Sequence, residues 1–214
     1  MKHMNRHRMC SIAIRTTGPF PRYHDLAEIT VISVDECLRM DQRVLPFTMY
    51  IQPTRLENID YEELKAFKIE DNNLDYSQFR MRKDMLTTYI RKGVEESMAA
   101  ELFVKWFEEN LKPDFRRKII PLVYDYSYCY PFLEDWLGRK TMDLLFDQRY
   151  RDLRACSLFM NDRAGYRCDI TYPFAKNNFK YICSQLKVDL ISNNTMSDAF
   201  ANIQCYERMC RNSL

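Results

Sequence analysis

Cysteine and histidine have the widest metal and redox chemistry in this sequence, and their spacing limits what they can do. The chain has eight cysteines and three histidines. No two cysteines form a Cys-x-x-Cys pair, and His3, His7 and His24 are not placed to complete a tetrahedral zinc site. Disulfide frameworks are typical of short secreted chains, whereas this chain has 214 residues. We therefore expect reduced thiols and no structural zinc.

Basic residues occur in short runs that could contact phosphate groups. The runs are residues 80–83, residues 116–118 and the arginines Arg149, Arg151 and Arg154. Tyr150 or Tyr166 could stack on a base beside them. Because acidic residues interrupt every run, a solvated charged surface is the simpler interpretation.

The composition is that of a folded chain. It is 46% hydrophobic and 29% charged, with a formal net charge of +2. These values exclude disorder, collagen-like repeats and a coiled coil as the main architecture, and the charge alone does not favour nucleic acid. No stretch reaches the roughly 18 apolar residues of a membrane span, and residues 1–9 lead into no signal-peptide core. We expect a soluble, cytoplasmic protein with no membrane partner.

The hydrophobic pattern predicts strands first and helices later. Apolar or β-branched runs at residues 10–15, 26–37 and 44–51 predict three strands with short connections, as in an antiparallel meander. Val94, Met98, Leu102 and Trp106 recur every four residues with Phe103 and Phe107 alongside, which predicts one broad apolar stripe on a helix ending near Pro113. The remaining expected elements are strands at 118–124 and 141–146 and helices at 131–137, 147–160, 176–186 and 197–210, the last capped by Ser197.

This order of elements predicts an α/β fold. We expect a mixed sheet, made of the antiparallel three-strand meander plus parallel strands, flanked by helices. Residues 1–9 are expected to be a flexible N-terminus and residues 10–212 a single domain. Residues 70–93 are rich in Asp, Asn and Arg and are expected to form a surface loop or a lid.

Three short motifs follow one another on these expected elements. Residues 16–18 (Thr-Thr-Gly) follow the first strand, residues 121–124 run into Phe-Leu at 132–133, and residues 197–202 open the last helix. The motifs resemble those of the DnaQ-like, DEDDh-type 3′→5′ exonucleases of the RNase H-like superfamily, which contain Asp-x-Glu-Thr-Thr-Gly and His-x-Ala-x-x-Asp. The resemblance covers roughly residues 10 to 210 and implies an RNase H-like fold.

The resemblance also implies which positions would be catalytic. Members of this family cleave phosphodiester bonds with two magnesium ions held by four carboxylates, and a histidine acts as general base. The aligned positions in this chain are Ala13 and Arg15 for the first two acids, Cys129 for the third, Asn202 for the fourth and Ser197 for the base. None of the five keeps its residue type.

These replacements are incompatible with a two-metal site. Ala13 offers no donor atom, and Cys129 offers a soft sulfur to a hard ion. Arg15 places a permanent positive charge where a divalent cation would lie, and at about 4 Å this repulsion is worth roughly 4 kcal/mol per unit charge. The resemblance therefore implies a pseudoenzyme that has no catalytic residues and binds no metal cofactor.

Arg15 has two interpretations. In the simpler one, Glu28 or another neighbouring acid pairs with its buried guanidinium. In the other, Arg15 binds a phosphate directly, and Thr16 and Thr17 add backbone and hydroxyl contacts, which would preserve nucleic-acid binding without cleavage.

Other acids could in principle replace the missing ligands. Asp125, Asp198 and Glu28 are the candidates for a relocated magnesium or manganese site. Neighbouring strand residues point to opposite faces, and one helical residue rotates a side chain by about 100°, so their convergence would require rearrangement.

We therefore expect a catalytically inactive exonuclease-like domain that binds a single strand or a nucleic-acid end without cleaving it. One alternative is a protein-protein interaction module or homo-oligomer that uses residues 70–93 or the alternating tyrosines Tyr124, Tyr126, Tyr128 and Tyr130. This tyrosine run has strand periodicity and would line the cleft, with core packing favoured over an adhesive surface. A second alternative is a metal-dependent 3′→5′ exonuclease with relocated ligands.

Overall fold

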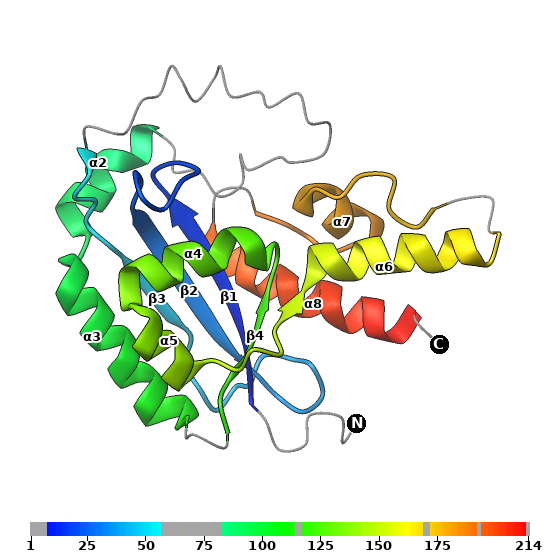
Figure 1. Ribbon diagram of the computed structural model, residues 1–214, viewed down its shortest axis with the longest axis horizontal. Coiled ribbons are helices and arrows are strands. Elements are labelled where there is room, and N and C mark those ends of the chain that lie inside the picture. Colours follow the sequence, from blue (N-terminus) through cyan, green and yellow to red (C-terminus); the bar gives the residue numbers. More distant parts are fainter. Residues whose placement is uncertain (1–7, 57–82, 114–116, 169–171, 192–193, 213–214) are drawn as a thin grey trace.

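A five-stranded mixed sheet runs through the centre of the protein (Figure 1). The computed structural model describes residues 8–56, 83–113, 117–168, 172–191 and 194–212. The strands are β1 (Met9–Thr16), β2 (Leu26–Val34), β3 (Phe47–Tyr50), β4 (Ile120–Val123) and β5 (Arg151–Asp152), in the spatial order β3-β2-β1-β4-β5. The first three strands pair antiparallel, whereas β4 pairs parallel with both β1 and β5. The expected mixed sheet with an antiparallel meander is confirmed.

Helices flank this sheet. They are α2 (Lys83–Lys92), α3 (Glu96–Trp106), the π-helical turn η3 (Phe107–Leu111), α4 (Tyr126–Leu137), α5 (Arg139–Leu145), α6 (Leu153–Tyr166), α7 (Phe179–Gln185) and α8 (Thr195–Asn212). In Figure 1, α4 crosses the sheet and α6 projects away from it. Helix α8 packs along β1 and β2. None of the helices in the described ranges is long and apolar enough to cross a membrane.

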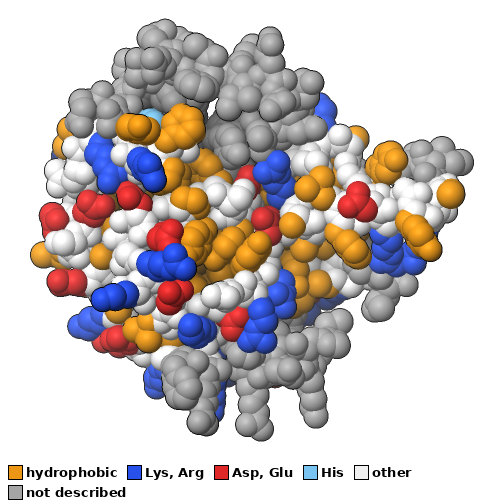
Figure 2. Space-filling view, viewed as in Figure 1, with side chains coloured by type: hydrophobic (Ala, Val, Ile, Leu, Met, Phe, Trp, Pro, Cys, Tyr) orange, Lys and Arg blue, Asp and Glu red, His pale blue; other side chains and the backbone are white. Residues whose placement is uncertain are grey.

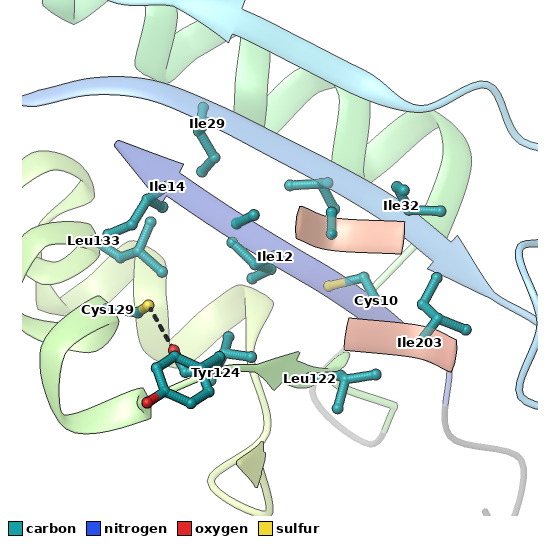
Figure 3. Close-up of a cluster of buried hydrophobic side chains, with 14 of the residues drawn as sticks. Cys10, Ile12, Ile14, Ile29, Ile32, Leu122, Tyr124, Cys129, Leu133 and Ile203 are labelled. Carbon is teal, nitrogen blue, oxygen red and sulfur yellow. Dashed lines mark hydrogen bonds between the residues drawn. The ribbon is translucent and has the colours of Figure 1, made fainter. Parts of the chain in front are cut away.

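Strands β1 and β2 are buried along their whole length, because elements cover both of their faces. Ser11 Oγ donates to the Ala199 carbonyl of α8 at 2.7 Å, so the odd-numbered side chains of β1 face α8. The even-numbered side chains, such as Ile12 and Ile14, therefore face the other layer. Figure 3 shows Ile14 beside Leu133 of α4 within this core.

The buried side of α3 and η3 is narrower than the expected apolar stripe. Phe103 and Phe107, which the stripe includes, are fully buried together with Ala99, whereas Met98 and Leu102 are exposed. Because all of these positions except Ala99 carry large apolar side chains, periodicity alone does not show which edge of the stripe meets the core. The packing of Phe103 and Phe107 against each other and against Trp106 decides it.

Two expected elements after residue 138 are wrong. The expected strand at 141–146 is the helix α5, in which Met142 and Leu145 are buried at helical spacing. Residues 151–152, expected within a helix, form the edge strand β5. Short apolar runs do not separate strand from helix, so the tertiary contacts determine both outcomes.

The alternating tyrosines lie mostly on a helix. Helix α4 begins at Tyr126, five residues before the expected start, and contains Pro131. Tyr124 and Tyr128 are buried, as the packing interpretation expects. The ring of the half-buried Tyr126 stacks on that of Tyr150, with centroids 3.8 Å apart and planes 8° apart.

Two of the expected segments, the N-terminal tail at 1–9 and the loop or lid at 70–93, lie partly outside the described residues. Residues 1–7 of the expected N-terminal tail lie outside the described residues, and Met9 is already buried in β1. Of the expected loop or lid at 70–93, residues 70–82 lie outside the described residues, and residues 83–92 form α2.

All eight cysteines are free thiols, and we expect two of them to react quickly with Ellman's reagent. Cys37 and Cys168 are exposed, whereas burial raises the pKa of Cys156 to about 11 and raises the pKa of Cys10 further. Because the thiolate is the reactive form, the buried thiols should react only after unfolding. Replacing Cys37 and Cys168 with serine should remove the fast phase, and a fast phase that persists would contradict this burial pattern.

Candidate functional site

The site lies between the carboxyl end of β1 and the first turns of α8. Ala13 and Arg15 share the face of β1 that meets α8, because side chains two apart on a strand point the same way. Asp198 and Asn202 are four residues apart on α8 and share the helix face that meets β1. The structure thus brings together three of the five predicted positions, Ala13, Arg15 and Asn202, and adds Asp198.

A buried ion pair occupies the centre of this site. The Arg15 Nη2 atom lies 2.5 Å from Asp198 Oδ2, and the two side chains are 4% and 11% exposed. Arg15 Nη1 also donates to its neighbour's carbonyl, Ile14 O, at 3.1 Å. The expectation that a neighbouring acid pairs with Arg15 is met by Asp198 and not by Glu28.

Two opposing effects act on the Asp198 carboxyl. Burial raises its pKa above the ordinary value, and the Arg15 charge and hydrogen bond lower it; the Glu28 carboxylate raises it further, so the pKa is raised overall. Arg15 is therefore the only one of these groups that favours the ionised carboxylate. Removing it would leave a buried acid with no compensating charge.

The space left beside the ion pair is small. Ala13, Asn202, Tyr124 and Phe179 contribute to the lining of a pocket of about 10 Å³. This volume holds about one water molecule, whereas pockets for ordinary small ligands measure about 300 Å³ or more. Asn202 Nδ2 donates to Ile12 O at 3.2 Å, and its buried Oδ1 has no hydrogen-bond partner in the described part of the protein.

Cys129 and Ser197, the other two predicted positions, do not line this pocket. Cys129 is buried in α4, and its Sγ donates to the Tyr124 carbonyl at 3.6 Å (Figure 3). Burial and the nearby carboxylates raise the pKa of this thiol. Ser197 was expected to cap the last helix, but α8 begins at Thr195, and Ser197 Oγ accepts the Ile191 amide at 2.9 Å.

Glu28 lies directly opposite Arg15 in the β1–β2 register, yet its oxygens have other partners. Tyr89 donates its hydroxyl to Glu28 Oε2 at 2.7 Å, and Thr195 donates to Oε1 at 2.5 Å. Burial and the Glu28 charge raise the pKa of the Tyr89 hydroxyl, which keeps it protonated as a donor. Glu28 therefore joins β2 to α2 and α8.

Asp125 has a structural role at the start of α4. It is buried, caps the helix by accepting the Tyr128 amide, and pairs with Arg154 Nη1 at 2.8 Å. Its backbone has φ of 60°, which is unusual outside glycine and is tolerated by aspartate. Asp125 does not line the pocket that Asp198 and Arg15 share.

Thr16 and Thr17 are buried, and their hydroxyls hydrogen-bond within the protein. Thr16 Oγ1 lies 2.8 Å from Gly18 O and 2.6 Å from the Tyr128 hydroxyl. Thr17 Oγ1 accepts the Asp25 amide at 2.8 Å. Together with Arg15, these side chains stabilise the end of β1 and the turn that follows it.

This donor set does not fit two magnesium ions. A guanidinium lies at the site, the Ala13 side chain has no ligand atom, and the one carboxylate among the described residues that line the pocket, Asp198, is already paired with Arg15. Among the described residues, no group of three or more His, Cys, Asp or Glu side chains could hold a metal ion. The arrangement supports structural pairing of β1 with α8.

Asp198 is the site residue whose place the sequence interpretation missed. We expected that Asp198 and Asp125 would need rearrangement to converge, and Asp125 does not line the pocket; Asp198, however, reaches β1 and pairs with Arg15. The signal was present, because Asp198 and Asn202 are spaced by four, which places both on one helix face.

No protein-family model matches this sequence, and no curated protein sequence matches it. Solved structures do match its fold. The chain is similar to E. coli Exonuclease I in complex with a dT13 oligonucleotide, with a TM-score of 0.58 and 12% identity over 97% of this chain and 43% of that chain. It therefore spans less than half the length of Exonuclease I.

In two further structures, the match extends over most of the other protein's chain. The nuclease domain of 3′hExo, a DEDDh family member bound to rAMP, matches with a TM-score of 0.58 and 12% identity over 96% of this chain and 92% of that chain. A chain in the structure of the yeast NOT1 MIF4G domain co-crystallized with CAF1 matches with a TM-score of 0.62 and 8% identity. The match covers 98% of this chain and 81% of that chain. The protein therefore has the mixed-sheet fold of the RNase H-like exonucleases.

Proposed function

We propose that this exonuclease-like domain binds single-stranded nucleic acid, or its end, without cleaving it. The main observation in support of a domain that does not cleave is the buried Arg15–Asp198 ion pair at the end of β1. A divalent ion there would face a fixed positive charge and would have to compete with Arg15 for Asp198, the only carboxylate among the described residues that line the pocket. The similar Exonuclease I structure holds an oligonucleotide, which supports nucleic acid as the ligand class.

The β1–β2 turn, residues 17–25, supports binding at this end of the sheet. Its tip exposes two aromatic rings, Phe20 and Tyr23, with Arg22 between them. Aromatic rings stack on unpaired bases of any sequence, and arginine pairs with phosphate. We assign the first contacts to this turn, because Arg15 could reach a phosphate only after its ion pair with Asp198 opens.

Hydrogen bonds from Arg55 and from residues near it fix the conformation of the turn. The Asp25 carboxylate accepts the amides of Thr54 and Arg55 at 2.8 and 2.7 Å. Arg55 Nη1 donates to Pro21 O at 2.5 Å, and its Nη2 donates to Asp135 at 3.0 Å. A turn ordered in this way loses little conformational entropy when its tip binds a ligand.

A labelled oligonucleotide tests both parts of the proposal. With pure protein and magnesium or manganese, we expect no shortening, while Exonuclease I under the same conditions shortens it. Manganese-dependent degradation that disappears in Asp198→Ala or Asp125→Ala would instead establish the alternative of relocated ligands.

Binding is measured by fluorescence anisotropy of a single strand. Phosphate contacts from Arg22 and, once its ion pair has opened, from Arg15 would make two contacts, which predict a roughly sevenfold loss of affinity between about 50 and 200 mM salt. Phe20→Ala and Tyr23→Ala should each weaken binding by about 1–3 kcal/mol, the value of one stacked base. Leu45→Ala is the matched control, because Leu45 is 82% exposed and precedes β3, at the far end of the sheet. No detectable binding at low salt, or equal loss in the control, would contradict the proposal.

A further inference from the structure

Two helices at opposite ends of the molecule expose apolar side chains. In Figure 1, α3 lies at one edge of the sheet and α6 projects from the other side. On α3, Met98 is 55% and Leu102 is 41% exposed; on α6, Phe159 is 66% and Tyr166 is 91% exposed. Within each pair the spacing of four or seven residues places both side chains on one helix face. Large apolar groups gathered in this way are typical of interaction sites.

The residues around the α3 pair are mainly acidic. Glu101, Glu108 and Glu109 are exposed along α3 and η3, and the exposed Lys105 lies 3.9 Å from Glu109. Figure 2 shows acidic and hydrophobic side chains along the edge over α3, with basic ones among them. We call this surface the acidic patch; its residues are Met98, Glu101, Leu102, Lys105, Glu108 and Glu109, of which three are acidic and one is basic.

Among the described residues around the α6 pair, basic side chains predominate. The half-buried Arg163 and the exposed Arg167 lie beside Tyr166 at the end of the helix, and Asp162 is the acid in this described part of the surface. In Figure 2, hydrophobic and basic side chains occur together on the projecting part of the molecule. We call this surface the basic patch; its residues are Phe159, Arg163, Tyr166 and Arg167.

We propose that the acidic patch of one copy of this chain binds the basic patch of a second copy, head to tail. Each patch has an apolar centre and a charged rim, which is the usual anatomy of a protein interface. The rims have opposite signs, so contact between different patches is attractive, while contact between two identical patches would bring like charges together. This charge complementarity favours a second copy of the chain as the occupant.

The position of the patches determines the type of assembly. A two-fold dimer requires both patches to face the same partner, whereas here they lie at opposite ends of the molecule. A contact between different patches leaves one patch free at each end of the pair. The assembly therefore grows by adding copies and does not stop at two.

The experiment is sedimentation velocity on the full chain at protein concentrations up to roughly 1 mM. Wild-type protein should show an average mass that rises with concentration and falls with added salt. Met98→Ser with Leu102→Ser removes the acidic patch, and Phe159→Ser with Tyr166→Ser removes the basic patch. All four side chains are exposed, so both variants should fold, which circular dichroism checks.

The decisive measurement is the mixture of the two variants. Each variant alone should remain a monomer, because each lacks one half of the contact. Mixed together, they should form a one-to-one complex and nothing larger, since each retains the patch that the other needs. A wild-type monomer at every concentration, variants that associate like wild type, or a mixture that stays monomeric would each overturn the proposal. None of these outcomes depends on whether the chain binds nucleic acid.

Discussion

Replacing Arg15 with methionine should lower the free energy of unfolding by about 3–5 kcal/mol, because it leaves the Asp198 carboxylate buried without its cation. Asp198→Leu should have a similar effect, since it leaves the Arg15 guanidinium unpaired. The double variant should recover most of the loss, because two apolar side chains can fill the space of a buried ion pair. Urea unfolding of the wild type, both single variants and the double variant measures the coupling.

The pH dependence of the Arg15→Met variant provides an independent readout. Burial already raises the pKa of Asp198, and loss of Arg15 removes the group that lowers it. A carboxyl with a raised pKa in the folded state contributes stability below its unfolded pKa of about 3.9, and this is lost as pH rises through the folded pKa. The deficit of the variant should therefore shrink as the solution is acidified.

A surface pair is the matched control for this cycle. Arg43 and Asp41 also pair at 2.8 Å, but the arginine side chain is 84% exposed. Arg43→Met should leave the unfolding midpoint nearly unchanged, because exposed ion pairs contribute little. A single variant at Arg15 that behaves like Arg43→Met would show that Arg15 is not buried against Asp198.

Phe107→Ala should lower the free energy of unfolding by about 3–5 kcal/mol, the usual effect of removing a buried phenyl ring. Phe107 is fully buried, and its ring lies 4.7 Å from that of Phe103 and 5.2 Å from that of Phe146. The cavity left behind would open the contact between η3 and the end of α5. Thermal or urea unfolding in dilute solution measures the loss.

Leu102→Ala is the matched control on the same helix. The four-residue pattern of the sequence predicts that Leu102 is buried, whereas the structure exposes it. The substitution should change stability by less than about 0.5 kcal/mol. Reversed results at Leu102 and Phe107 would mean that α3 is rotated relative to the sheet.

Much of the architecture was predictable because strand and helix periods are local properties of the sequence. The runs that became β1, β2 and β4 and the helix α8 were expected within a few residues of their observed bounds. The elements that were wrong are the short ones, α5 and β5. Few residues define their period, so contacts with the rest of the protein decide between strand and helix.

The amino-acid sequence by itself determined that acids are missing from the positions that the exonuclease resemblance identifies. Strand alternation was enough to place Ala13 and Arg15 on one face, and no arrangement of neighbours could make alanine a ligand. Only the tertiary structure decided that Arg15 pairs with Asp198, while Glu28, directly across the strand pair, bonds to Tyr89 and Thr195. The physical reason is that periodicity sets which side chains share a face within one element, whereas the partner of a buried charge depends on how distant elements pack against it.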